Sequence, residues 1–437
     1  MRRIPVRTFS RLAYAPIIFI ALLAMAVAND ARAELKPGMT VTRVNREVAQ
    51  DYVSPGVYWA IEYGMDVKIV ENKPIILPKL YQEATEKYAG QATVGDDNDL
   101  KNWVAGRPFP VIDETDPKAA LKIMWNFSRT HYYSDDLNVH LPDADTGALR
   151  IDPENKRHYD IERHFIVDWA RRLRIVGRVH NEPLPAFEEN PDKTFEKAAF
   201  FPLIEPFDLK GVGTVSYRYL DPAKFDDTWL YTPVIRRVRR LSSAQRSDAL
   251  FGQDIDLDSF GGYAGQVPWF DWKYIGKKPM LAVFHGENLP PVVCEGDGGM
   301  TYCENWEIRP EMFIVEGTPK LKGYAFSKRV IYVDKEAYLI PYSDLYDNNG
   351  ELWKLVLNYI RTSTKPNPNT ELTYDEEHQF VYGFSVFDTQ LMHGTRSAIP
   401  GMAFPDEPGW YVDIGMDHEY SVDQDWYTVA ALIQKGR

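Results

Sequence analysis

The chain has 437 residues, 44% of them hydrophobic, and its 50 Lys and Arg face 63 Asp and Glu, a formal net charge of −13. A chain of this length can bury a large core. An acidic surface repels nucleic acids and anionic membranes at long range, and nucleic-acid recognition requires a basic face. No nucleic-acid partner is therefore expected.

The first 33 residues have the pattern of an export leader. Residues 2–11 hold four arginines, residues 13–28 are apolar and almost uncharged, and Ala31–Ala33 offers the small residues of a cleavage site. We predict a signal peptide over 1–33 that is cleaved before Glu34, and the alternative is an uncleaved membrane anchor. Without it, 45 basic residues face 62 acidic ones, a net charge of −17.

The remainder, residues 34–437, is expected to form a single domain because no linker or fixed-period repeat divides it. Helical spacing occurs at Leu77–Gln91, and Asp116-Pro117 is typical of a helix start. A third helix is expected over Arg163–Arg178. These patterns predict a helical N-terminal part over about 34–200 and a β-rich remainder.

From about residue 205 the sequence alternates with the period of strands. In "VGTVSYRYLDP" (Val212–Pro222) the residues Val215, Tyr217 and Tyr219 share one face, with Ser216 and Arg218 opposite. Two strands are expected around Gly276, and turns at Asp334-Lys335 and Asn349-Gly350, of which Asn-Gly is a strong hairpin signal. Successive hairpins form an antiparallel sheet, so we predict a mainly β (α+β) fold with a strongly curved sheet.

The chain contains two cysteines, Cys294 and Cys303, in the glycine-rich stretch "CEGDGGMTYC". An even pair in an exported chain predicts a disulfide. The alternatives are a metal site and a redox pair, but no ligand set is complete and the spacing is not C-x-x-C.

Motifs for catalysis, metal binding and nucleotide binding are absent from the sequence. The stretch "DIDLD" (Asp254–Asp258) resembles the start of a calcium loop, but its twelfth position is Gly265 where a Glu is needed. The acidic Asp375–His378 is typical of a solvated turn. We predict no catalytic residue, cofactor or metal site, which favours a binding protein over an enzyme.

The stretch "YTPVIRRVRRLSSAQRSD" (Tyr231–Asp248) concentrates five arginines in this acidic chain. Its alternation predicts a hairpin that turns at Pro233–Arg236, with Arg237 and Arg239 on one face of the return strand. Buried arginines need a partner. The candidates for a ligand head group or for internal ion pairs are Arg237, Arg239, Arg246 and Asp248.

The sequence resembles periplasmic proteins related to the lipoprotein-sorting carriers LolA and LolB, through "WLYTPVIRRVRRLSSAQRSDALFGQDIDLDSF" (Trp229–Phe260). One branch of that group, the domain-of-unknown-function 1329 family, is matched more fully. The matching stretches are "ATEKY" (Ala84–Tyr88), "WVAGRPFP" (Trp103–Pro110), "DPKAALKIMWN" (Asp116–Asn126), "RVIYVDKEAY" (Arg329–Tyr338), "LYDNNGELWK" (Leu345–Lys354) and "FDTQLMHGT" (Phe387–Thr395).

The resemblance implies a curved, incompletely closed antiparallel β-barrel whose open face is covered by helices. In the sorting carriers the hollow holds acyl chains during transit through the periplasm. As candidates to line such a hollow we take Tyr217, Tyr219, Trp229 and Tyr231, and the alternative is that they fill a solid core. This chain is about twice as long as the sorting carriers and adds the cysteine loop, so the same cargo does not follow.

These observations predict a periplasmic carrier of a lipid or other hydrophobic molecule that serves envelope transport or outer-membrane biogenesis. The resemblance adds, as partners, an inner-membrane exporter of the resistance-nodulation-division type and an outer-membrane protein. Two alternatives stay open. One is a periplasmic hydrolase of lipid or polysaccharide with carboxylates from Asp254–Asp258 or Asp375–Glu377, and the other is an accessory subunit of an envelope exporter.

Overall fold

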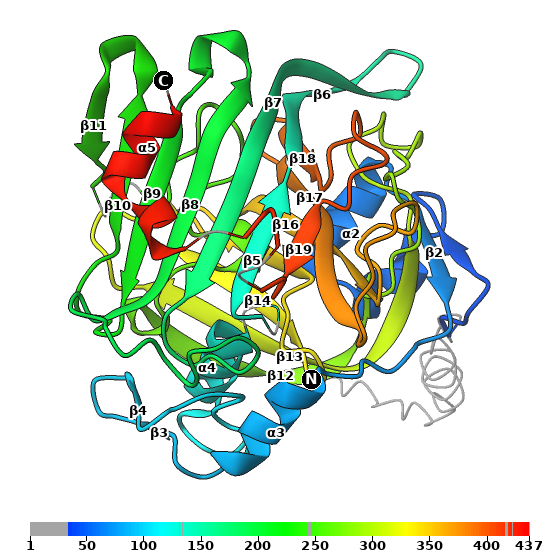
Figure 1. The fold of residues 1–437 in the computed structure, drawn as a ribbon. Helices are drawn as coiled ribbons and strands as arrows, with labels where there is room; N and C mark the ends of the chain where they lie inside the picture. Colours follow the sequence, from blue (N-terminus) through cyan, green and yellow to red (C-terminus); the bar gives the residue numbers. More distant parts are fainter. Residues whose placement is uncertain are drawn as a thin grey trace, which may run out of the picture. The chain divides into compact units, whose positions relative to one another are not determined.

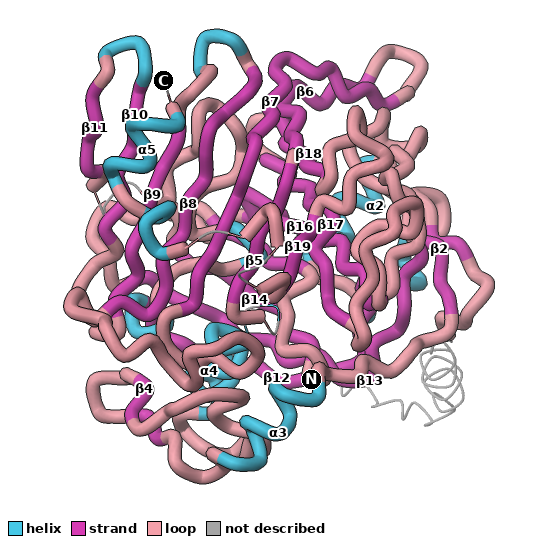
Figure 2. The backbone as a smooth tube through the Cα atoms, in the orientation of Figure 1, coloured by secondary structure: helices cyan, strands magenta, loops and turns pink. Residues whose placement is uncertain are grey.

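The computed structural model describes residues 34–130, 132, 134–242, 246–415, 418–421 and 423–436. The predicted signal peptide, residues 1–33, lies outside the described residues. Residues Lys36–Arg437 form one compact unit. Its strands, shown in Figures 1 and 2, are β1 (Thr40–Val41), β2 (Val67–Val70), β3 (Thr93–Val94), β4 (Leu100–Lys101), β5 (Asp136–His140), β6 (Asp143–Ile151), β7 (Arg157–Arg174), β8 (Thr194–Glu205), β9 (Gly213–Tyr219), β10 (Asp227–Thr232), β11 (Arg237–Arg240), β12 (Phe270–Ala282), β13 (Asn305–Pro319), β14 (Lys328–Asp334), β15 (Tyr342–Tyr346), β16 (Leu352–Ser363), β17 (His378–Asp388), β18 (His393–Ala398) and β19 (Trp410–Val412).

Helices are few and short by comparison. The α-helices of the described residues are α2 (Pro55–Tyr63), α3 (Lys79–Lys87), α4 (Ala119–Thr130) and α5 (Val429–Lys435). The 3-10 helices are η1 (Arg46–Tyr52), η3 (Phe207–Leu209), η4 (Pro233–Ile235), η6 (Phe260–Gly262), η7 (Val267–Trp269) and η8 (Gln424–Tyr427). Among the described residues, no helix has the length and apolar character needed to cross a bilayer.

Nearly all strands belong to one sheet. In pairing order its main run is β11-β10-β9-β8-β7-β6-β18-β17-β16-β15-β14-β13-β12, and every one of these pairs is antiparallel. At its margins β5 joins β7 to β19, and β2 pairs with β1 and, in parallel, with β13. Among the described residues β11 pairs with β10 and β12 with β13, and these two outer strands do not pair with each other. The mainly β fold is thus confirmed, and its sheet is open and not closed into a barrel.

Two of the three predicted helices are confirmed. The helix α3 lies within Leu77–Gln91, and α4 begins just after Asp116-Pro117. The third prediction is wrong, because Arg163–Arg178 is occupied largely by β7. This strand is paired along its length, with β6 and β5 on one side and β8 on the other, and tertiary pairing overrides local spacing. In the predicted helical part the helices all lie before Asp136, among the short strands β1–β4, and the longer strands from β5 onward follow.

The predicted turns are confirmed, with one correction. Asn349-Gly350 joins β15 to β16, Asp334-Lys335 follows β14, and Pro233–Arg236 joins β10 to β11. The two strands expected around Gly276 are one strand, β12, with a bulge there. Gly276 has φ +151°, a conformation that glycine adopts without strain.

The helices lie on different parts of the sheet. The helix α2 packs on β15 and β16, α4 on β12, and α5 on β8, β9 and β10. The largest core cluster is built around α4, β12–β14 and the segment before β12, and includes Trp125, Phe270 and Phe313. The helical cover over an open face, which the family resemblance implied, stays a prediction.

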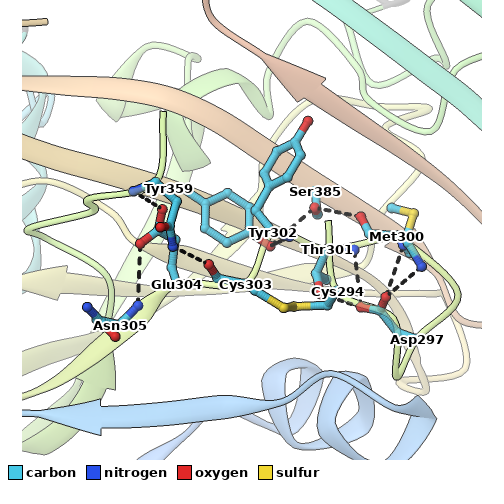
Figure 3. The surroundings of a disulfide bond; sticks show 12 residues. Cys294, Asp297, Met300, Thr301, Tyr302, Cys303, Glu304, Asn305, Tyr359 and Ser385 are labelled. Atoms are coloured by element: carbon cyan, nitrogen blue, oxygen red, sulfur yellow. Dashed lines mark hydrogen bonds between the residues drawn. A yellow bond between two sulfur atoms is a disulfide. The ribbon is translucent and has the colours of Figure 1, made fainter. Parts of the chain in front are cut away.

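Cys294 and Cys303 form the predicted disulfide in the loop between β12 and β13 (Figure 3). Within the loop, Asp297 accepts hydrogen bonds from the backbone N–H groups of Gly299, Met300 and Thr301, at 3.0, 3.0 and 3.1 Å. Burial raises the pKa of Asp297 to about 6, although these hydrogen bonds oppose the rise. The loop is therefore fixed both covalently and by a buried carboxyl group.

Removing the disulfide with Cys294→Ser and Cys303→Ser together is expected to lower the free energy of unfolding by about 2–3 kcal/mol, because a short closed loop restricts the unfolded chain. The loop joins residues nine apart in sequence. Urea denaturation measures the change, and wild type unfolded in the presence of reductant should match the variant. Equal stability of oxidised wild type and the variant would contradict the prediction.

Candidate functional site

A cavity of about 320 Å³ lies between one face of the sheet and residues 246–264, here called the crossing segment. Strands from β10 round to β16 contribute to it, which shows that the sheet curves about this space. Its apolar lining includes Leu137, Val139, Ala144, Phe165, Val167, Ala198, Phe200, Leu203, Leu250, Phe251, Leu257, Phe260, Val381, Phe384, Ile399 and Trp410.

The alternate aspartates of "DIDLD" fix the crossing segment. Asp254 bonds to β18 and Asp258 to Tyr324 outside the segment, and Asp256 bonds to Ser259 within it. Asp254 Oδ2 accepts from Thr395 Oγ1 at 2.8 Å, and His393 Nδ1 lies 2.9 Å away. Asp256 Oδ2 accepts from Ser259 Oγ at 2.6 Å, and burial raises the pKa of Asp256 to about 6.

Between these anchors Ile255 enters the main core and Leu257 faces the cavity. The motif that resembled a calcium loop therefore has a structural role, which is to fix the crossing segment. Its carboxylates, one of the two sets that the hydrolase alternative named, already have partners.

One wall of the cavity carries a buried ion-pair network. Arg218 Nη2 lies 2.8 Å from Asp226 Oδ2, and Arg246 Nη1 lies 3.3 Å from the same oxygen. Arg246 Nε donates to Asp258 Oδ1 at 2.6 Å. Burial disfavours the charge on both guanidinium groups, but these aspartates outweigh it and raise the pKa of Arg218 and of Arg246. Both arginines therefore stay charged and already have internal counter-ions.

Arg172, on β7, differs from the other cavity arginines. It is half-buried and lines the cavity, yet among the described residues its guanidinium has no hydrogen bond and no ion pair. It also lines a smaller adjoining hollow of about 60 Å³, together with Arg218 and Glu196. Phe165 and Leu203 line only the larger cavity. The cavity therefore has a mainly apolar end, where Asp143 also lies and accepts from Ala398 N and Met402 N, and an end that carries several charged groups.

The four aromatic residues predicted to line the hollow do not line this cavity. The cavity is lined by Thr214, Ser216 and Arg218, the alternate residues of β9. The core cluster on the opposite face contains Tyr231, with Tyr217 and Trp229 packed against it, and includes Tyr427 and Leu432 from the C-terminal segment. Tyr217 Oη donates to the Tyr427 carbonyl at 2.7 Å, and Tyr219 Oη to Asp227 Oδ2 at 2.8 Å.

Of the four residues predicted to contact a ligand head group, some lie at the cavity and others lie away from it. Arg246 lies at the cavity, in the ion-pair network. Arg237 and Arg239 are exposed on β11, and Asp248 is also exposed. The structure thus brings one of the four candidates to the site. The sequence analysis did not identify Arg172, Arg218 or Asp226 as cavity residues. For Arg218 a signal was available, because the alternation of the strand places it on the face opposite to Tyr217.

The chain matches, over residues 40–399, the family described as "Protein of unknown function (DUF1329)". It belongs to the DUF1329 family. A search of curated proteins finds no match to this chain. The solved structures similar to this family member include a DUF1329 family protein from Desulfovibrio piger, with 18% identity and a TM-score of 0.45, covering 73% of this chain and 100% of that chain.

Two further structures are similar to this DUF1329 chain. One, from Vibrio parahaemolyticus, is described as an outer membrane lipoprotein-sorting protein domain and has 13% identity and a TM-score of 0.46, covering 73% of this chain and 100% of that chain. The other is a LolA superfamily protein from Nitrosomonas europaea, with 13% identity and a TM-score of 0.36, covering 71% of this chain and 98% of that chain.

Proposed function

We propose that this DUF1329 protein is a periplasmic carrier that binds an amphiphilic molecule with an apolar body and an anionic group. The single observation that carries the proposal is the cavity of about 320 Å³, apolar over most of its lining, with Arg172 at its charged end and no partner for Arg172 among the described residues. Ligand pockets in proteins typically have volumes of about 300–1,000 Å³ and a few polar groups that fix orientation.

The energetics favour such a ligand. Burial of each CH₂ group contributes about 0.8 kcal/mol before ordering costs. A half-buried guanidinium without a partner is costly, and a carboxylate, phosphate or sulfonate would satisfy it. Arg218 and Arg246 have less to gain because Asp226 and Asp258 already neutralise them. Arg172 is therefore the residue that would select an anionic group.

The proposal also includes that the protein lies in the periplasm and that it binds its ligand without catalysing a reaction. The Cys294–Cys303 disulfide is typical of an oxidising compartment such as the periplasm. The carboxylates Asp254 and Asp258 bond the crossing segment to residues outside it and Asp256 bonds within it, which favours binding over hydrolysis at this site.

The binding of 11-(dansylamino)undecanoic acid and of its methyl ester, followed by dansyl fluorescence, tests the proposal. Ala198 faces the cavity, so Ala198→Phe is expected to weaken binding of both probes by at least about tenfold. Ala223→Phe, at an exposed turn, is the matched control and should bind as wild type. Arg172→Met should weaken the acid by about tenfold and leave the ester unchanged.

Circular dichroism confirms that each variant is folded. Native mass spectrometry of mildly purified protein should in addition show a bound amphiphile. Failure of wild type to bind either probe, or equal binding by Ala198→Phe and Ala223→Phe, would refute the proposed cavity.

A further inference from the structure

Two hairpin tips at one end of the sheet expose large apolar side chains. Phe207 on η3, between β8 and β9, is 90% exposed, and Val234 and Ile235 on η4, between β10 and β11, are 83% and 47% exposed. Figure 2 shows both short helices at the top of neighbouring hairpins. The tips are close, because a Cβ on Gly211 would lie 2.9 Å from Pro233 Cγ. We call this surface the tip patch.

Basic side chains surround the tip patch. Lys210, Arg236, Arg237 and Arg239 are exposed, and in the described residues none of them has a side-chain hydrogen bond or an ion pair. One nearby acid, Asp208, is already neutralised, because it pairs with Arg163. Glu205, at the end of β8, is also exposed. The local charge is therefore positive on a chain with a net charge of −13.

We propose that the tip patch docks on an anionic phospholipid surface, with Phe207, Val234 and Ile235 entering the interface and the arginines contacting lipid phosphates. Interfacial binding combines buried apolar area with attraction to anionic lipids, of about 1 kcal/mol for each Lys or Arg near the surface. The acidic remainder does not cancel this attraction, because charges beyond a Debye length of about 8 Å are screened at physiological salt.

The placement of the charges orients the molecule. Within a Debye length of an anionic membrane only the basic tips are attracted, so this end of the molecule is the one that binds. Arginine keeps its guanidinium at the phosphates while its aliphatic stem lies along apolar groups. The tips project from strand ends as convex points, which suits insertion between head groups.

Docking in this orientation would turn the apolar end of the cavity toward the lipid. Leu203 and Phe165, with Leu209 of η3 packed against them, form a cluster on the tip side of β8. The charged end, with Glu196 and Arg218, lies at the opposite ends of β8 and β9. The docking proposal itself does not depend on a ligand in the cavity.

Sedimentation with vesicles of phosphatidylcholine alone and of phosphatidylcholine with phosphatidylglycerol tests the proposal. Wild type is expected to bind the anionic vesicles, less at high salt. The triple variant Arg236→Gln, Arg237→Gln and Arg239→Gln should bind at least about tenfold more weakly. The matched control Lys68→Gln, Lys193→Gln and Lys322→Gln changes the charge equally at exposed sites away from the tips and should bind as wild type.

Insertion of the hairpin tips into the lipid interface can be measured separately from binding. Val234→Cys labelled with an NBD fluorophore should gain fluorescence on addition of anionic vesicles, and the pair Val234→Ser and Ile235→Ser should weaken sedimentation with them. Equal binding by the two triple variants would overturn the proposal. The proposal would also be overturned if wild type did not bind the vesicles and instead dimerised through the tips. Dimerisation would be seen as concentration-dependent sedimentation that the pair Val234→Ser and Ile235→Ser abolishes.

Discussion

Replacing Arg246 by methionine is expected to lower the free energy of unfolding by about 3–5 kcal/mol, the cost of breaking a buried ion pair on one side. Arg246 is buried and contacts Asp258 at 2.6 Å and Asp226 at 3.3 Å. Methionine has a similar volume but no charge, so Asp258 would lose its ionic partner inside the protein. Tyr324 Oη, which donates to Asp258 Oδ2 at 2.9 Å, does not neutralise it.

Urea denaturation followed by circular dichroism measures this loss. The control is Arg239→Met at an exposed position of β11, where the change should remain within about 0.5 kcal/mol. Addition of Asp258→Asn to Arg246→Met should recover part of the stability, because the unpaired carboxylate is removed. If Arg246→Met and Arg239→Met were equally stable, the network would not hold the crossing segment.

A second large effect is expected from Asp344, on β15. Asp344 Oδ1 accepts from Ser54 Oγ at 2.9 Å and Oδ2 accepts from Gly56 N at 3.2 Å, which joins the start of α2 to the sheet. Burial raises the pKa of Asp344 to about 7. An ordinary aspartate in the unfolded chain has a pKa of about 3.9.

The sign of the pH dependence follows from this rise. Between the two pKa values the unfolded chain has released the proton while the folded protein retains it, so stability falls as the pH rises. The contribution is fully present below about pH 4 and is lost by about pH 7. At 1.36 kcal/mol per pKa unit the loss is on the order of 4 kcal/mol.

The variant Asp344→Asn keeps the shape of the protonated side chain and removes the titration. The stability difference between wild type and Asp344→Asn should change in favour of the variant between pH 4 and pH 8, by on the order of 4 kcal/mol. Asp248→Asn, at an exposed position, is the control. Parallel pH profiles for wild type and Asp344→Asn would disprove a raised pKa at this site.

The local pattern of the sequence predicted the parts of the fold that depend on neighbouring residues. The hairpin at Pro233–Arg236, the Asn349-Gly350 turn and the Cys294–Cys303 disulfide each depend on a short stretch. The helix expected over Arg163–Arg178 failed because β7 is stabilised by pairing with distant strands on both sides.

The cavity could not be predicted for a related reason. Alternation in β9 and β10 separates two faces but does not say which face lies inward. The aromatic face, with Tyr217 and Tyr231, is covered by residues near the C-terminus, and the hydrogen bond from Tyr217 to Tyr427 spans 210 positions. This cover left the face with Ser216 and Arg218 for the cavity, and Arg172 gave no local signal at all.

The open sheet leaves two outer strands whose backbone groups could pair with another molecule. An exposed strand edge is a template for fibre growth, and proteins protect it with short strands, charged side chains and bulges. β11 is four residues long and contains three arginines, and β12 carries Lys273, Lys277 and Lys278 with a bulge at Gly276. The arginine run "RRVRR" therefore also serves solubility, because it keeps identical chains from joining edge to edge.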